Sequence, residues 1–391
     1  MKKNILILTL LALVATAPAF AATEGPYTYI IRDGQAVITR FDSSWSGSPI
    51  ITNELGGCPV ASIGDIAFFA CMSLTSISIP DSVTNIGSQA FIWCDALTSV
   101  TLGKGVSHIG SEAFSENLSL ASIEVHPDNL HYVSRDSALF NKALTTIIQY
   151  PCARSGAYTI PDTVTTIGKS SFFASINLTA ITIPDSVTTI EMSGFGYCRS
   201  LTSLTIPNSV TNIGMSAFAG CSSLVSVTLP HAITSLEANT FYQCESLTSI
   251  TIPAGVTNIG ECAFWICDSL TAVYFDGDAP AADNDAFFDS PATLYYLPGS
   301  SGWDATFSYR PTALWLPKIT LSSHNPQNGK FTLSCFWSVG QPVAIQATTS
   351  LTNPQWQTIH AATIPASGTI DYEDPDSATH SSRFYRILIR I

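Results

Sequence analysis

A segment of 23 residues repeats along most of this chain. The copy LTSISIPDSVTNIGSQAFIWCDA occupies residues 74–96. Further copies begin at Leu97, Leu178, Leu201, Leu224 and Leu247, with an irregular copy at Leu120 and a decayed copy at Leu270. A fixed period of this length is typical of a solenoid, in which each repeat stacks on the next. One repeat has too few apolar side chains to fold alone, so we expect a continuous stack.

Apolar side chains fall in the same columns in every repeat. In one copy these columns are Leu201, Leu204, Ile206, Val210, Ile213 and Phe218. The alternation of period two at the start predicts a strand that turns its leucines and isoleucine inward and leaves Ser203 and Thr205 on the outer face. We expect a second short extended segment after the turn at 207–208, and a helical or irregular turn at 216–220.

The pattern L-T-S-I-T-I-P-x-x-V-T-x-I-G-x-x-A-F-x-x-C-x-S resembles the BspA-like leucine-rich repeat of bacterial surface and secreted proteins. The resemblance covers about residues 27–310, including a first rung in 34–68 and a longer repeat form at 125–151. It implies a mainly β solenoid, a leucine-rich repeat stack of about ten rungs. It also implies adhesion or protein binding at a cell surface, without catalysis.

Two further regions flank the predicted repeat domain, which we place at residues 23–317. Two lysines, an apolar run at 5–14 and the sequence Ala19-Phe20-Ala21 predict a secretory signal peptide at residues 1–22. The apolar run is too short to span a membrane, so we expect no transmembrane segment in the mature chain. The predicted protein is therefore exported, as a secreted, periplasmic or cell-surface associated protein.

The last part of the chain, residues 318–391, predicts a small C-terminal β-sandwich module. KFTLSCFW, PVAIQATTSL and RFYRILIRI alternate like strands, with turn residues between them. The segment resembles the terminal modules of exported bacterial proteins that end in an F-Y-R motif. We expect its core to contain Trp356, Tyr385, Ile387 and Ile389, and its surface to carry Arg386 and Arg390.

The composition excludes one class of partner. Only 12% of the residues are charged and 46% are apolar, which favours a packed core over disorder. Removal of the predicted signal peptide leaves 14 basic against 29 acidic residues. Phosphate backbones repel such a chain, so we expect no nucleic-acid partner.

Six of the ten cysteines occupy one column of the repeat. They are Cys71, Cys94, Cys198, Cys221, Cys244 and Cys267. Parallel side chains in a stack have poor geometry for an S–S bond, so we expect structural thiols, with some disulfides or a metal site as alternatives. Cys58, Cys152, Cys262 and Cys335 lie outside this column, and the sequence does not pair them.

Few residues suggest catalysis, a cofactor or a metal. There is no G-x-S-x-G motif, and the histidines are scattered, so we expect neither an enzyme nor a cofactor. His126 and His131 lie close together in the longer repeat, but their spacing fits no metal-ligand motif. Four acids are weak candidates for calcium, although they lack EF-hand spacing and also suit the polar cap of a terminal repeat. They are Asp276, Asp278, Asp283 and Asp285.

The candidate binding residues form two sets on the predicted solenoid. The first is a hydroxyl column on the strand face, Ser203, Thr205, Ser226 and Thr228, which is either a soluble scaffold or a binding surface. The second is a group of aromatic residues at varying positions beside the phenylalanine column, which are either anchors of an interface or turn packing. It contains Trp93, Tyr197, Tyr242 and Trp265. The excursion at 124–158, with His126 and His131, is a further contact candidate.

Together these features predict an exported, non-catalytic leucine-rich repeat protein that binds an extracellular or cell-surface protein. A glycan is a second kind of partner, in which case the chain is a carbohydrate-binding protein. The remaining alternative is a structural spacer or surface-layer component that is attached through its C-terminal module.

Overall fold

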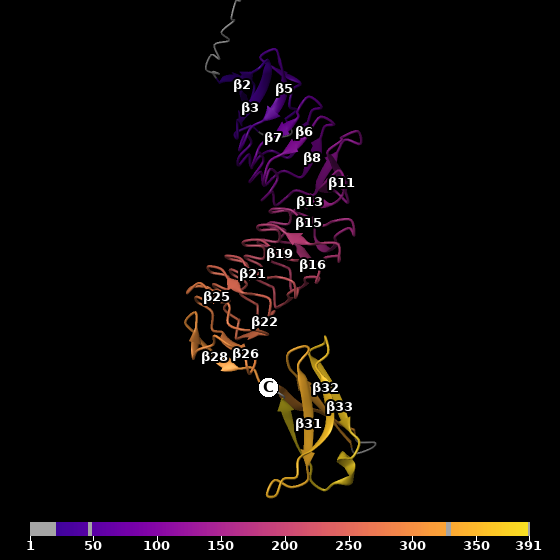
Figure 1. The fold of residues 1–391 in the computed structure, drawn as a ribbon. Helices are drawn as coiled ribbons and strands as arrows, with labels where there is room; N and C mark the ends of the chain where they lie inside the picture. Colours follow the sequence, from indigo (N-terminus) through magenta and orange to yellow (C-terminus); the bar gives the residue numbers. More distant parts are fainter. Residues whose placement is uncertain (1–20, 46–48, 326–329, 390–391) are drawn as a thin grey trace, which may run out of the picture. The chain divides into compact units, whose positions relative to one another are not determined.

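The structure, a computed structural model, describes residues 21–45, 49–325 and 330–389, without the side chains at 320–325. The predicted signal peptide lies outside the described residues as far as position 20. The chain forms two compact units, Met1–Ser155 with Thr166–Asn177, and Gly156–Thr165 with Leu178–Ile391. Nearly all regular structure is β, as Figure 1 shows. We describe each unit by itself.

The first unit begins with an antiparallel hairpin and continues as stacked parallel strands. Its strands are β1 (Ala22–Glu24), β2 (Tyr27–Arg32), β3 (Gln35–Phe41), β4 (Glu54–Leu55), β5 (Cys58–Ile63), β6 (Ser76–Ile79), β7 (Asn85–Ile86), β8 (Ser99–Leu102), β9 (His108–Ile109), β10 (Ser122–Val125), β11 (Tyr132–Arg135), β12 (Ala138–Asn141), β13 (Thr146–Gln149) and β15 (Thr166–Ile167). Strands β6, β8 and β10 pair in parallel, and β5, β7 and β9 form a second parallel column. The longer repeat contains the antiparallel strands β11, β12 and β13.

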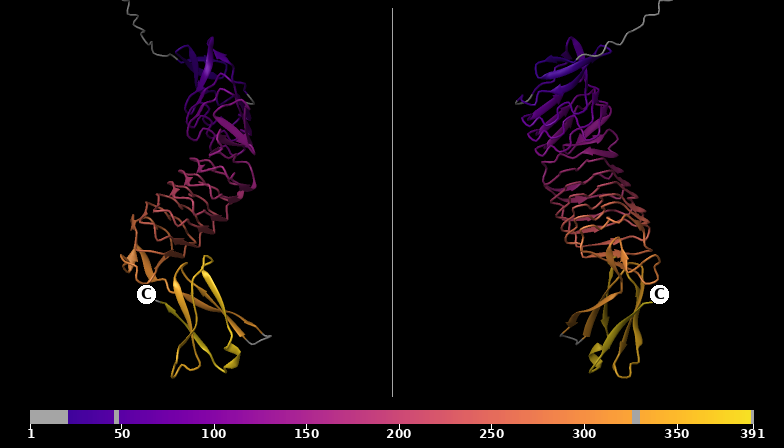
Figure 2. Two further views of the ribbon diagram at one scale, coloured as in Figure 1. Left: turned by 45° about the vertical axis from the view of Figure 1, so that its right-hand side comes forward. Right: turned by 90° about the vertical axis from the view of Figure 1, so that its left-hand side faces the viewer.

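The second unit has two parallel strand columns of its own and ends in the C-terminal module. Its solenoid strands are β14 (Gly156–Thr159), β16 (Leu178–Thr182), β17 (Thr189–Ile190), β18 (Ser203–Thr205), β19 (Asn212–Ile213), β20 (Ser226–Thr228), β21 (Ser235–Leu236), β22 (Ser249–Ile252), β23 (Asn258–Ile259), β24 (Ala272–Phe275), β25 (Ala281–Ala282), β26 (Thr293–Tyr296), β27 (Thr306–Phe307) and β28 (Arg310–Leu314). Parallel pairs join β22, β24, β26 and β28, and likewise β21, β23 and β25. The two views in Figure 2 show these rungs stacked. The β-solenoid prediction is confirmed.

A stack of phenylalanine rings forms the centre of each unit. In the second unit Phe195, Phe218, Phe241, Phe264 and Phe287 are fully buried, with successive ring centroids 5.0–5.7 Å apart. In the first unit the stack contains Phe68, Phe91 and Phe114. Tyr150 takes the phenylalanine position in the longer repeat and stacks on Phe172 at 5.0 Å. Each rung therefore buries its aromatic ring against the next rung.

The predicted turn at 216–220 is irregular rather than helical. Ser216 and Gly220 have φ values of +57° and +72°, and equivalent turns in other rungs have the same two left-handed positions. Such angles are incompatible with a continuing right-handed helix. The one helical segment among the described residues is the 3₁₀ turn η1 (Ser377–Thr379).

The C-terminal module consists of two three-stranded antiparallel sheets. One contains β29 (Lys318–Asn325), β30 (Lys330–Phe336) and β33 (Thr369–Asp374), and the other contains β31 (Pro342–Thr348), β32 (Gln357–Thr363) and β34 (Phe384–Ile389). Ile387 and Ile389 pack against its buried cluster, as expected, and Arg386 is exposed. Trp356 is not in the core: it is partly exposed, and the Arg386 guanidinium lies 4.4 Å from its ring centroid. Arg390 lies outside the described residues.

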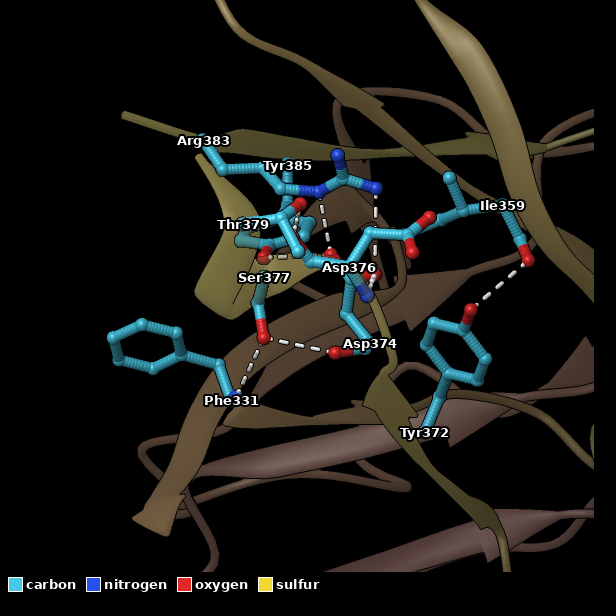
Figure 3. A network of polar contacts seen from close by, with 9 residues as sticks. All are labelled: Phe331, Ile359, Tyr372, Asp374, Asp376, Ser377, Thr379, Arg383 and Tyr385. Carbon is cyan, nitrogen blue, oxygen red and sulfur yellow. Dashed lines mark hydrogen bonds and ion pairs between the residues drawn. The ribbon is translucent and has the colours of Figure 1, made fainter. Parts of the chain in front are cut away.

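A buried polar network joins the end of β33 to β34 (Figure 3). Asp374 is fully buried and pairs with Arg383, whose Nε lies 2.5 Å from the carboxylate. The Tyr385 hydroxyl donates to the same carboxylate at 2.9 Å. Burial, together with this hydrogen bond, raises the pKa of Tyr385 to about 12. The aspartate therefore has ionic and neutral donors where water is excluded.

Candidate functional site

The predicted hydroxyl column lies on the exposed strand face. Ser203 and Thr205 of β18 pair in register with Ser226 and Thr228 of β20, and all four side chains are exposed. Leu204, between the first two, is buried. The strand alternation therefore places the column outside, as the sequence predicts.

These four hydroxyls differ from those of a second threonine stripe. Thr188, Thr211 and Thr257 each donate a hydrogen bond to a backbone carbonyl of the preceding rung, at 3.3–3.5 Å. Within the described residues, the side chains of the four column residues make no hydrogen bond. The stripe is thus part of the scaffold, whereas the column keeps its hydrogen-bonding capacity for a ligand.

A pocket of about 800 Å³ covers part of this column. Ser203, Thr205 and Thr228 line one wall, and residues 336–339 and 366–368 of the C-terminal module line another. Trp337 is buried and donates its Nε1 hydrogen to the carbonyl of Trp315 at 2.9 Å, while Ser338 donates to Asp276. The module is therefore packed on the last rungs by apolar contacts and hydrogen bonds.

The four weak metal candidates are not gathered into one site. Asp276 accepts from Ser338, and burial raises its pKa. Asp278 accepts the backbone amide of Ser301 at 2.7 Å, and Asp285 contacts the thiol of Cys262 at 3.6 Å. Asp283 is exposed. In the described part of the chain, the one group of three potential ligands within 4.8 Å is Glu261, Cys262 and Asp285.

That ligand group differs from the set suggested by the sequence and lacks a prepared thiolate. Burial, with the nearby Asp285, raises the pKa of the Cys262 thiol to about 11. A metal ligand must be deprotonated, and this thiol resists deprotonation. Cys262 and Glu261 come from the rung before Asp285, so only the 23-residue register brings them together.

The aromatic candidates lie in different surroundings. Trp93 is 43% exposed, and its Nε1 donates to Glu116 at 2.7 Å. Tyr197 is half-buried, with the Arg199 guanidinium 5.7 Å from its ring centroid. Tyr242 and Trp265 are also half-buried and contact each other, with centroids 5.7 Å apart. Phe288 of the next rung, which the repeat pattern does not single out, contacts Trp265, with ring centroids 5.8 Å apart.

His126 and His131 are both exposed. The buried residue of this segment is Asn129, whose side-chain amide donates to the carbonyls of Gly103 and Val106 at 3.0 and 2.9 Å. Its side-chain oxygen accepts the backbone amide of His131 at 2.8 Å. Asn129 therefore anchors the longer repeat and leaves the histidines at the surface.

The cysteine column is structural. All ten cysteines are present as thiols without disulfides. Cys221, Cys244 and Cys267 are fully buried, and each thiol donates to the carbonyl of the phenylalanine in the preceding rung at 3.2–3.3 Å. The column thus joins successive rungs by weak S–H hydrogen bonds.

The sequence matches the family described as "BspA type Leucine rich repeat region" in six copies, over residues 61–193 and 150–271. The chain belongs to the BspA-type leucine-rich repeat family. This is a family of repeat proteins and not of enzymes. No protein of curated function matches this chain. Within the described residues, no helical stretch has the length and apolar character that a membrane crossing needs.

Several solved structures are similar to this BspA-type chain. A leucine-rich repeat protein from Eubacterium ventriosum is 20% identical, with 70% of this chain and 96% of that chain covered and a TM-score of 0.49. A leucine rich cell surface protein from Faecalibacterium prausnitzii is 23% identical, with 73% and 97% covered and a TM-score of 0.35. A leucine-rich repeat protein from Bacteroides ovatus is 20% identical, with 70% and 94% covered and a TM-score of 0.28.

Proposed function

We propose that this chain is an exported, non-catalytic protein that binds an extracellular or cell-surface protein on the strand face of its solenoid. The observation that carries this proposal is that the hydroxyl column lines the pocket with side chains free to form hydrogen bonds to a ligand. Ser203, Thr205 and Thr228 line it, and their hydroxyls make no hydrogen bond within the described residues. A partner segment in the pocket would supply the missing donors and acceptors.

The walls of the pocket support a macromolecular partner. Polar groups such as Asp185 and His231 lie there beside the exposed apolar side chains of Phe336 and Val339. Mixed apolar and hydrogen-bonding surface is typical of protein interfaces. The two walls come from separate folded regions of the second unit, so a bound segment would contact both.

The test is saturable binding of the mature chain, residues 23–391, to an array of extracellular proteins and glycans. The variant T205R/T228R places two long cationic side chains in the pocket and should weaken binding at least about tenfold. The matched control S78R/T101R changes the same column in the first unit, at Ser78 and Thr101, which are also exposed. This control variant should bind the partner as tightly as the parent chain does.

Other outcomes separate the alternatives. Selective binding of a glycan would assign the carbohydrate-binding function instead. Absence of saturable binding, together with release of the protein from cells when residues 318–391 are deleted, would favour the spacer attached through its C-terminal module.

A further inference from the structure

A partly exposed row of aromatic rings lies on the turns of the second unit. It consists of Tyr242, Trp265 and Phe288, which we call the aromatic row. Each directly follows a buried phenylalanine of the central stack in the chain. The rings contact one another edge to face, with centroids 5.7 and 5.8 Å apart. Phe288 is 54% exposed and the other two are half-buried.

The row lies in strongly acidic surroundings. No lysine or arginine occurs between residues 200 and 309. Six exposed acids occupy the same turns or the residues beside them: Glu237, Glu245, Glu261, Asp268, Asp283 and Asp289. None of the ion pairs in the described ranges involves these six acids. Their negative charge is therefore not neutralised by basic side chains of the described chain.

The contacts place charge and rings in the same turns. The backbone amide of Trp265 donates to the backbone carbonyl of Cys262 at 3.1 Å, and that of Phe288 donates to the backbone carbonyl of Asp285 at 3.0 Å. The carboxylates of Glu261 and Asp285 lie within 4.8 Å of each other. Like charges at this distance repel, and a cation placed between the rungs would relieve the repulsion.

The chain already contains the kind of contact that a cationic partner would make. In the rung that begins at Leu178, the Arg199 guanidinium lies 5.7 Å from the ring centroid of Tyr197. At the equivalent repeat positions two and three rungs later, the sequence has Glu245 and Asp268. The later turns have an aromatic ring one repeat position before that of Tyr197, at Tyr242 and Trp265, and an acid in place of the base. Residues 201–309 thus offer these rings no basic side chain, and a partner would supply the cation.

From this complementarity we propose that the aromatic row binds a lysine- and arginine-rich segment of a protein partner. Aromatic faces attract cationic side chains, and the surrounding carboxylates attract the same charge over a longer range. A second copy of this chain, with 29 acidic and 16 basic residues, would be repelled. None of these residues lines the pocket that covers the hydroxyl column, so failure of this proposal leaves the proposed function standing.

The test titrates a decalysine peptide into the mature chain at low ionic strength, with tryptophan fluorescence and calorimetry as readouts. The variant E237Q/E261Q/D268N removes three charges beside the row and should weaken binding about tenfold, from about 0.5 kcal/mol for each charge. The control D33N/E54Q/D128N removes three exposed acids of the first unit and should change binding less than about twofold. Melting curves should show that both variants are folded.

A further variant tests the rings themselves. W265L keeps an apolar side chain but removes the aromatic face, and it should weaken binding about threefold. Equal losses from both acidic triples would mean that the peptide responds only to net charge, and the proposal would be wrong. It would also be wrong if W265L bound as tightly as the parent chain, if decalysine did not bind, or if a decaserine peptide bound equally well.

Discussion

At the scale of single residues, glycine sets how closely neighbouring rungs approach. A Cβ atom added at Gly260 would lie 2.6 Å from the backbone nitrogen of Ala238, and one added at Gly214 would lie 2.6 Å from that of Met192. Real Cβ atoms do not approach backbone so closely, so a larger residue there must push the rungs apart. The rung between these glycines has Glu237 at the same repeat position, so in this part of the second unit the glycine contact is interrupted at that rung.

We therefore predict that Gly260→Ala destabilises the second unit by about 2 kcal/mol, as expected for overpacking against rigid backbone. The measurement is the urea midpoint of unfolding, followed by circular dichroism. Glu237→Ala is the matched control, since it removes a side chain at the same position and should change the midpoint little. An unchanged midpoint in Gly260→Ala would show that the rungs can separate at no cost.

The thiol column leads to a prediction for alkaline pH. Burial raises the pKa of Cys221 and of Cys267 to about 12, from an ordinary value of 9.0. Above pH 9 the unfolded chain releases thiol protons that the folded chain retains, so stability falls as pH rises toward 12. The free energy of unfolding should decrease by up to about 1.4 kcal/mol per pH unit for each thiol.

Chemical denaturation at several values between pH 8 and pH 11 measures this slope. The variant C221S/C267S should have a shallower slope, because serine does not titrate in this range and is already present in the column at Ser175. A slope identical to that of the parent chain would assign the alkaline loss of stability to other groups.

At the scale of elements, the sequence predicts the repeated parts well and the unique parts less well. The inward columns of the rung at Leu201 are buried as expected, because a 23-residue register fixes each side chain several times over. The prediction that Trp356 lies in the core is wrong, because the residue precedes β32 and no strand alternation fixes the direction of its side chain. Tyr150 was missed because the longer repeat breaks the register, although its ring still takes the phenylalanine position.

The polar network of the C-terminal module holds two elements that are separated by the turn at η1. We predict that Asp374→Asn destabilises the module by about 3 kcal/mol, because it leaves the Arg383 guanidinium, which is largely buried, without its counter-charge. Tyr385→Phe removes one hydrogen bond and should cost only about 1 kcal/mol. Hydrogen exchange of β33 and β34, measured by mass spectrometry, should be faster in the first variant than in the second. Equal exchange in both would contradict the assigned role of the ion pair.

At the scale of the whole molecule, the candidate site needs contacts that the repeat alone does not predict. The hydroxyl column follows from strand alternation, but its pocket also requires residues 336–339 and 366–368, more than 100 positions further along the chain. The sequence predicts the aromatic row in part. The repeat pattern alone does not separate Tyr242 and Trp265 from Trp93, whereas their ring contacts with each other and with Phe288 do.

The proposed binding of an extracellular partner requires that the chain be exported, which its first 22 residues predict. Expressed with its own N-terminus in a bacterial host, the chain should be recovered outside the cytoplasm with Ala22 or Thr23 as its first residue, as mass spectrometry of the intact protein will show. Leu8→Arg places a charge in the apolar run that the export machinery recognises, and it should leave an uncleaved, cytoplasmic precursor. Thr9→Ser, a neutral change in the same run, is the control. Retention of the parent chain in the cytoplasm with Met1 intact would remove the basis for an extracellular partner, because neither binding surface would then meet one.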